Sequence, residues 1–122
     1  MKTLPVLLLL MLAACGHKQM SKDDLSGSYA RAFRSEYAVG TDTLQFSKAS
    51  DDTYRIKKVT NYHRIKNGVM ADSVEHHEEH WLGVYDKGHA VVRVLPSGKV
   101  ISVDVQQNEI LLGSNIYKRI DE

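Results

Sequence analysis

The sequence is poor in cysteine, in long apolar runs and in excess charge, and each shortage excludes a class of protein. Cys15 is the single cysteine, so an internal disulfide is impossible and the core alone must stabilise the fold. The longest mainly apolar run covers residues 3–14, whereas a transmembrane helix needs about 20 apolar residues. Glycine-rich loops of the kind that bind phosphate groups or dinucleotides are also absent from the sequence.

The N-terminus has the features of an export signal that ends at a cysteine. One lysine precedes an apolar segment with the length of a signal-peptide core, and small residues stand directly before Cys15. The sequence Leu12-Ala13-Ala14-Cys15 resembles the lipobox of bacterial lipoproteins, in which the peptide is cut before the cysteine. The resemblance implies removal of residues 1–14, lipidation of Cys15 and attachment to a membrane by acyl chains. The alternative is an ordinary secretory signal followed by an unmodified cysteine.

The processed chain would be one small, neutral domain on a tether. Removal of residues 1–14 takes away one lysine and no acid, which leaves 15 basic and 15 acidic residues. A neutral domain has no electrostatic surface for nucleic acid, so we expect no nucleic-acid partner. Residues 15–24 are polar after the cysteine and lack apolar periodicity, which is typical of a flexible tether. We expect a single domain at residues 25–122.

The residues that follow Cys15 bear on where the anchored protein lies. No aspartate follows Cys15 directly, so the inner-membrane retention signal of enteric bacteria is absent. Lys22-Asp23-Asp24 resembles the surface-export signal of some Gram-negative lipoproteins, although it lies further from the cysteine than that signal usually does. We therefore expect an outer-membrane lipoprotein of the cell envelope that faces the periplasm or the cell exterior.

The rest of the chain predicts short strands separated by turns. β-Branched and aromatic residues are frequent after Leu25, and turn residues such as Asn67-Gly68 and those at 39–42 interrupt them. The spacing favours an all-β fold, an antiparallel meander of about eight strands that closes into a small barrel. Residues 72–82 also fit helical spacing, but Asn67-Gly68 favours a strand on each side. The expected strands are Gly27–Tyr37, Thr43–Ser47, Thr53–Ile65, Met70–Tyr85, Ala90–Leu95, Lys99–Val105, Glu109–Leu112 and Asn115–Ile120.

Several short pieces of the chain resemble small lipoproteins of Gram-negative bacteria with a lipocalin-like domain. Leu25-Ser26-Gly27-Ser28-Tyr29 resembles the Leu-x-Gly-x-Tyr opening of lipocalin-like barrels. Further similarities run from Glu36-Tyr37 to the closing Leu112-Gly113 and Tyr117-Lys118. The resemblance implies a lipocalin-like β-barrel or meander on a lipid tether, and it implies no particular activity and no particular site residues.

The segment Glu75–His80 is the part of the sequence that most resembles a chemical site. His76-x-x-Glu79-His80 matches the motif of the inverted zinc proteases, which works on a helix and needs a further ligand from a second helix. The residues after His80 predict strands, so we expect no enzyme. On a strand, His76, Glu78 and His80 share one face and would bind zinc or copper weakly if a neighbouring strand supplied more ligands.

A hairpin at Asn67-Gly68 offers this cluster no further ligand, because it places Glu78 opposite Lys57 and His80 opposite Arg55. We therefore favour a ladder of opposite charges between the two strands. Its members are Arg55, Lys57 and Lys58 on one strand and Glu75, Glu78 and Glu79 on the next. Protonation of the histidines near pH 6 would add positive charge beside the basic strand, which predicts lower stability in mild acid.

Aromatic side chains are the remaining candidates for a site. Tyr29, Phe33 and Tyr37 share one face of the first expected strand, and together with Trp81 they would line a pocket in the barrel or simply form its core. The expected function is non-enzymatic and needs no cofactor: a lipid-anchored binding module for a small apolar ligand or for another envelope protein. The alternatives are an inhibitor or immunity lipoprotein, similar to lysozyme inhibitors, that inserts a loop at Pro96–Lys99, and a weak metal-binding protein.

Overall fold

The computed structural model describes residues 20–120, so the expected signal peptide and Cys15 lie outside the described residues. Within this range no helix is long and apolar enough to cross a membrane. The described chain forms strands throughout. They are β1 (Gly27–Arg34), β2 (Ala38–Ser50), β3 (Thr53–Lys66), β4 (Val69–Met70), β5 (Glu75–Asp86), β6 (Val91–Leu95), β7 (Val100–Asp104), β8 (Glu109–Leu112) and β9 (Asn115–Ile120).

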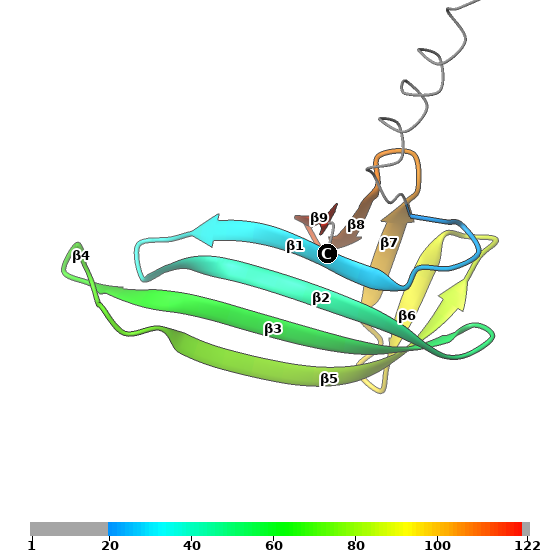
Figure 1. The fold of residues 1–122 in the computed structure, drawn as a ribbon, viewed down its shortest axis with the longest axis horizontal. Coiled ribbons are helices and arrows are strands. Elements are labelled where there is room, and N and C mark those ends of the chain that lie inside the picture. Colours follow the sequence, from blue (N-terminus) through cyan, green and yellow to red (C-terminus); the bar gives the residue numbers. More distant parts are fainter. Residues whose placement is uncertain (1–19, 121–122) are drawn as a thin grey trace, which may run out of the picture.

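Eight of these strands close into an antiparallel barrel (Figure 1). Their order around the sheet is β2-β1-β9-β8-β7-β6-β5-β3, and pairing between β2 and β3 completes the circle. The two-residue strand β4 is an addition to the end of β3. Since only the β1–β9 pairing joins strands that are distant in sequence, the barrel is a closed meander. The prediction of an all-β antiparallel barrel of about eight strands is confirmed.

The predicted turn at residues 39–42 is wrong, because these residues lie inside the long strand β2. The chain turns earlier, at residues 35–37, where the Ser35 hydroxyl oxygen accepts hydrogen bonds from the amides of Tyr37 and Ala38, both at 3.2 Å. Gly40 is required in the strand by packing, since a Cβ there would lie 2.1 Å from the carbonyl oxygen of Asn61. A glycine that normally indicates a turn is here a point of close approach between two strands.

Residues 75–86 form strand β5, so the strand interpretation is confirmed for residues 75–82, whereas residues 71–74 interrupt the predicted strand Met70–Tyr85. The register differs from the predicted one by two residues, because His80 lies opposite Lys57 and not opposite Arg55. Next to the turn, Ile65 pairs with Met70 as the hairpin signal predicts. The extra residues at 71–74 then shift β5 along β3. A shift of two residues leaves each side chain on the same face of the sheet.

Alternate side chains of the strands fill the interior of the barrel. Tyr29, Tyr54 and Tyr117 are fully buried there, together with aliphatic residues from β2, β3 and β6–β8. Tyr29, Phe46, Tyr54 and Tyr85 form a row of edge-to-face ring contacts with centroids 5.5, 6.0 and 6.4 Å apart. Together with Tyr117, these four aromatic residues contribute a large buried area to the core.

The segment before β1 covers one end of the barrel. The amide of Met20 donates to Asn108 Oδ1 at 2.7 Å, and Met20 itself is 2% exposed. Leu25 is also buried, and its carbonyl accepts a 2.8 Å hydrogen bond from the Tyr29 hydroxyl. Residues 20–24 were expected to be part of the tether, but they pack on the barrel; residues 15–19 lie outside the described range.

β2, β3 and β5 are much longer than the other strands, and together with the end of β1 they continue past the barrel. β1 pairs with β9 only at residues 28–30, and β5 pairs with β6 only at residues 82–86. Beyond these pairings, β1, β2, β3 and β5 form a four-stranded sheet that we call the extension (Figure 1). Its two open edges are Arg31–Arg34 of β1 and Glu75–Trp81 of β5. We call its far end, formed by residues 35–37 and 67–74, the tip.

Candidate functional site

The four aromatic residues predicted to line a pocket are not brought together. Tyr29 lies in the core, while Tyr37 is 71% exposed at the tip. Phe33 is half-buried on the extension, with the Arg31 guanidinium 5.4 Å from its ring centroid. Trp81 is half-buried at the edge of the core, and Lys99 Nζ lies 5.0 Å from its ring. Because these four residues are spread from the core to the tip, they do not line one ligand pocket.

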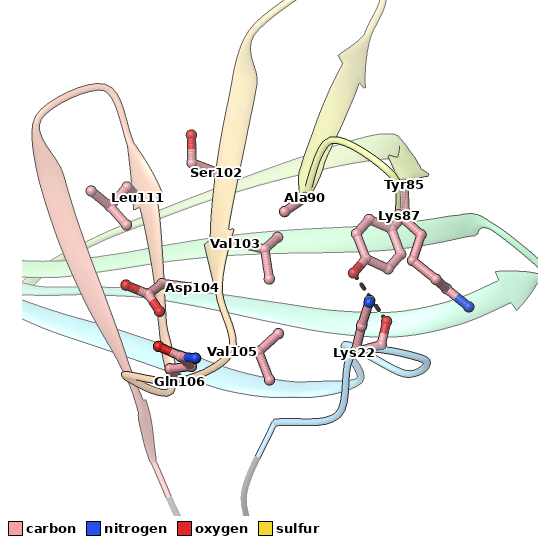
Figure 2. A pocket seen from close by; sticks show the side chains of 10 residues that line it. All are labelled: Lys22, Tyr85, Lys87, Ala90, Ser102, Val103, Asp104, Val105, Gln106 and Leu111. Carbon is pink, nitrogen blue, oxygen red and sulfur yellow. Dashed lines mark hydrogen bonds between the residues drawn. The ribbon is translucent and has the colours of Figure 1, made fainter.

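An open hollow of about 430 Å³ lies at the covered end of the barrel (Figure 2). Aliphatic side chains of Ala90, Val103 and Leu111 contribute to its walls, with Lys22 and Lys87 at the side of the N-terminal segment. Two contacts hold that segment in place: the Tyr85 hydroxyl donates to the Lys22 carbonyl at 3.0 Å, and Lys87 Nζ lies 2.8 Å from Asp23 Oδ1. The hydroxyl of Tyr85 and the ammonium group of Lys87 therefore hold the N-terminal segment against the barrel.

The predicted cluster on β5 is brought together on the outer face of the sheet. His76 Nε2 lies 2.9 Å from one oxygen of Glu78, and His80 Nε2 lies 3.4 Å from the other. Lys57 Nζ approaches the same carboxylate to 3.7 Å. The hydrogen bond from His76 and the positive charge of Lys57 lower the pKa of Glu78. Within residues 20–120, no group of three His, Cys, Asp or Glu side chains is arranged to hold a metal ion.

The predicted charge ladder between β3 and β5 exists, with one change of partner. Lys57 pairs with Glu78, and Lys58 Nζ lies 3.9 Å from Glu79. Glu75 pairs with Arg64 at 2.8 Å. Arg55 was expected to join the ladder, but the shifted register places it opposite Leu82. Such exposed pairs of opposite charge help to define the register of the two strands.

A buried polar network that sequence reasoning missed lies where the barrel core meets the extension. Asp42 accepts hydrogen bonds from Thr60 Oγ1, from Arg31 at 3.0 Å and from the Tyr117 hydroxyl at 3.4 Å. Burial and the neighbouring carboxylate raise the pKa of Tyr117 to about 12. The Arg31 guanidinium also lies 5.8 Å from the Tyr117 ring. Because the buried Asp42 carboxylate accepts hydrogen bonds from three side chains, its polar oxygens are not left without partners where the core ends.

The signal for this network was the alternation of Asp42 with Leu44 and Phe46 on one face of a strand. All three side chains are buried in the structure. Gly40 and Asp42 within the same four residues favoured a turn instead, because these two residue types are frequent in turns.

Exposed apolar side chains gather at the tip of the extension. Tyr37, Val69, Met70 and Val74 are 71, 68, 54 and 59% exposed. Tyr37 and Met70 lie on either side of Ile65, whose amide donates to the Tyr37 carbonyl at 2.8 Å. A hollow of about 580 Å³ lies between the turns that end β1 and β3, and of these four side chains only Tyr37 lines it. We call this set of four side chains the apolar tip.

A second apolar area lies on the outer face of the barrel. Leu82 of β5 is directly opposite Leu95 of β6, and both are exposed. Val84 and Val100 lie on either side of Arg93 in the same part of the sheet. The positively charged side chain of Arg93 therefore lies within this apolar area. This apolar area therefore serves as the comparison surface for the tip.

Comparison with known proteins gives no match among protein-family models, curated proteins or solved structures. The resemblance to lipocalin-like lipoproteins therefore stays an inference from short pieces of sequence.

Proposed function

We propose that the protein is a lipid-anchored, non-enzymatic lipoprotein of the outer membrane that binds another envelope protein through its apolar tip. The observation that carries this proposal is the gathering of four exposed apolar side chains at the end of a protruding sheet. Burying exposed apolar surface against a partner is favourable, and groups of such residues are typical of interaction sites.

The position of the tip relative to the anchored end supports a protein partner. Met20, the first described residue, lies against Asn108 at the covered end of the barrel. The tip lies at the opposite ends of β2 and β3 (Figure 1). β3 has 14 residues, which corresponds to about 45 Å at roughly 3.3 Å per residue. A lipid on Cys15 would therefore place the tip far from the point of attachment, where it can meet another protein.

A small ligand inside the barrel has less support. The interior is filled by Tyr29, Tyr54, Tyr117 and aliphatic side chains, and the two hollows described above are open ones, one at the covered end of the barrel and one at the tip of the extension. Barrels of eight strands are commonly filled in this way. The filled interior favours the function that uses the outer surface.

An inhibitor or immunity role would also be a protein-binding function, but the element that inserts into the target would not be the loop Pro96–Lys99. Pro96–Lys99 was expected to project, but it forms a tight turn in which Gly98 N donates to the Val94 carbonyl at 2.8 Å. Lys99 packs over Trp81. The element that protrudes is the extension, so an inhibitor of this kind would insert its tip into the target.

The proposal is tested with two matched triple variants of the lipidated protein in native envelopes. One variant replaces the tip residues (Val69→Ser, Met70→Ser and Val74→Ser), and the control replaces the barrel residues (Val84→Ser, Leu95→Ser and Val100→Ser). We expect proteins recovered with the wild type to be at least about tenfold depleted with the tip variant and retained with the control. Equal recovery with both variants, or loss only with the control, would overturn the assignment to the tip.

A further inference from the structure

Strand β5 has an open edge along residues 75–81. β6 pairs with β5 only from Leu82 onward, and no other strand in the described part of the chain pairs with it on that side. The amide of Tyr85 donates to the Asp52 carbonyl at 2.7 Å, on the side of β3. Main-chain groups alternate in direction along a strand, so those of His76, Glu78 and His80 point out of the open edge. This edge can pair with another strand.

The same three residues place their side chains on the outer face, where two imidazoles meet one carboxylate. His76 and His80 approach different oxygens of Glu78, at 2.9 and 3.4 Å. Imidazole and carboxylate are ligands that zinc and similar divalent ions accept. The described part of a single chain does not form a three-residue group arranged to hold such an ion. A site of this chemistry is therefore incomplete without further ligands.

We propose that a second copy of this chain supplies them, by antiparallel pairing of two β5 edges around divalent cations of the zinc class. A two-fold axis between two antiparallel strands is perpendicular to the sheet, so it pairs residues of the same face. An axis at Glu78 places His76 of each copy opposite His80 of the other, and the two Glu78 residues opposite each other. All of these residues direct their main-chain groups into the shared edge.

The pairing creates two equivalent cation sites. Side chains directly opposite each other have Cβ atoms about 4.5–5.5 Å apart, from which two imidazoles reach a common ion. Each site holds His76 of one copy, His80 of the other and one Glu78 carboxylate, with a fourth position for water. On the inner face, His77 of each copy lies opposite Glu79 of the other, which adds complementary side chains.

The charges of the cluster make this dimer depend on the cation. Two Glu78 carboxylates directly opposite each other repel, and bound cations remove that repulsion. Lys57 opposes cation binding, because its ammonium group lies 3.7 Å from Glu78. Asn61 contacts His76 Nδ1 at 2.6 Å and leaves Nε2 directed toward Glu78. The tip takes no part, so this inference stands apart from the proposed function.

The test uses residues 15–122 with Cys15→Ser, stripped with EDTA and then titrated with zinc chloride. In sedimentation velocity we expect a monomer that becomes a dimer at one zinc ion per chain and reverts with EDTA. In hydrogen exchange, the amides of His76, Glu78 and His80 should exchange at least about tenfold more slowly in the zinc-bound protein. A one-to-one zinc complex that stays monomeric would overturn the proposal, as would the absence of zinc binding.

Variants separate the cluster from other histidines. His76→Ala and His80→Ala should abolish the zinc-dependent dimer, while His89→Ala, which removes an exposed histidine of the β5–β6 turn, should leave it unchanged. Lys57→Met should bind zinc more tightly, by about tenfold. The tip variant with serine at 69, 70 and 74 should still dimerise. Dimers that persist in His76→Ala would show that the cluster does not hold the cation.

Discussion

Replacement of Asp42 by asparagine should destabilise the protein far more than an exposed substitution of the same kind. The carboxylate is buried and accepts hydrogen bonds from Arg31, Thr60 and Tyr117. An asparagine keeps the size but leaves the Arg31 guanidinium, whose side chain is only 22% exposed, without its counter-charge. Loss of a charged partner at such depth costs about 2–4 kcal/mol. For a domain of this size that corresponds to a fall in Tm of about 10 °C or more.

Thermal unfolding followed by circular dichroism measures this fall, with Asp51→Asn in the exposed β2–β3 turn as the matched control. A spectroscopic titration of the tyrosines gives a second readout. The pKa of Tyr117 is raised to about 12 by burial and by the Asp42 carboxylate, so it should fall in Asp42→Asn while burial keeps it above its ordinary value. A Tm within about 2 °C of wild type, or an unchanged tyrosine titration, would refute the reasoning about this network.

Two further predictions concern pH and the anchor. The pKa of Glu78 is lowered chiefly by its hydrogen bond from His76, and that of Asp86 by its hydrogen bond from His89, so both carboxylates stabilise the fold at neutral pH. This contribution is present above the ordinary carboxyl pKa of about 4 and is lost as the pH falls through the lowered values. We therefore expect the Tm to decline as the pH falls below about 4.5, whereas a Tm that stays unchanged through this range would contradict the stabilising role of the two carboxylates. Cys15→Ser should abolish acylation without changing the circular dichroism spectrum, and metabolic labelling with a fatty acid checks this, since labelled Cys15→Ser would contradict lipidation at Cys15.

Strand boundaries were predictable where the turn residues act locally. β8 and β9 have the predicted limits, because Asn108 and Gly113 take the positive φ values of 60° and 63° that turns require. Asn67 and Gly68 likewise form the predicted hairpin turn, with φ values of 52° and 78°. In these places the short-range preference of a residue and the fold agree.

The remaining features depend on residues that are distant in sequence. Gly40 lies in a strand because Asn61 approaches it closely, and Met20 is buried because Asn108 binds its amide. Neither contact leaves a local signal. The two-residue shift of β5 arises from residues 71–74, whose composition does not reveal how many of them leave the ladder.

The candidate site was predictable in its residues but not in its arrangement. His76, Glu78 and His80 do share one face of a strand, as their spacing indicates. The open edge beside them depends on where β6 begins to pair with β5, which only the closed barrel defines. The apolar tip was missed because Tyr37 and Val74 were both placed inside expected strands, Gly27–Tyr37 and Met70–Tyr85, whereas β1 ends at Arg34 and β5 begins at Glu75.

The central claim, that the tip contacts an envelope protein, is tested most directly by site-specific photocrosslinking in living cells. A photoreactive phenylalanine analogue is placed at Tyr37 in the apolar tip or, as the control, at Ile116, which is exposed on the barrel. We predict a discrete, protease-sensitive adduct from position 37 and none from position 116. Adducts from position 116 alone, or no adduct from position 37, would contradict the proposal.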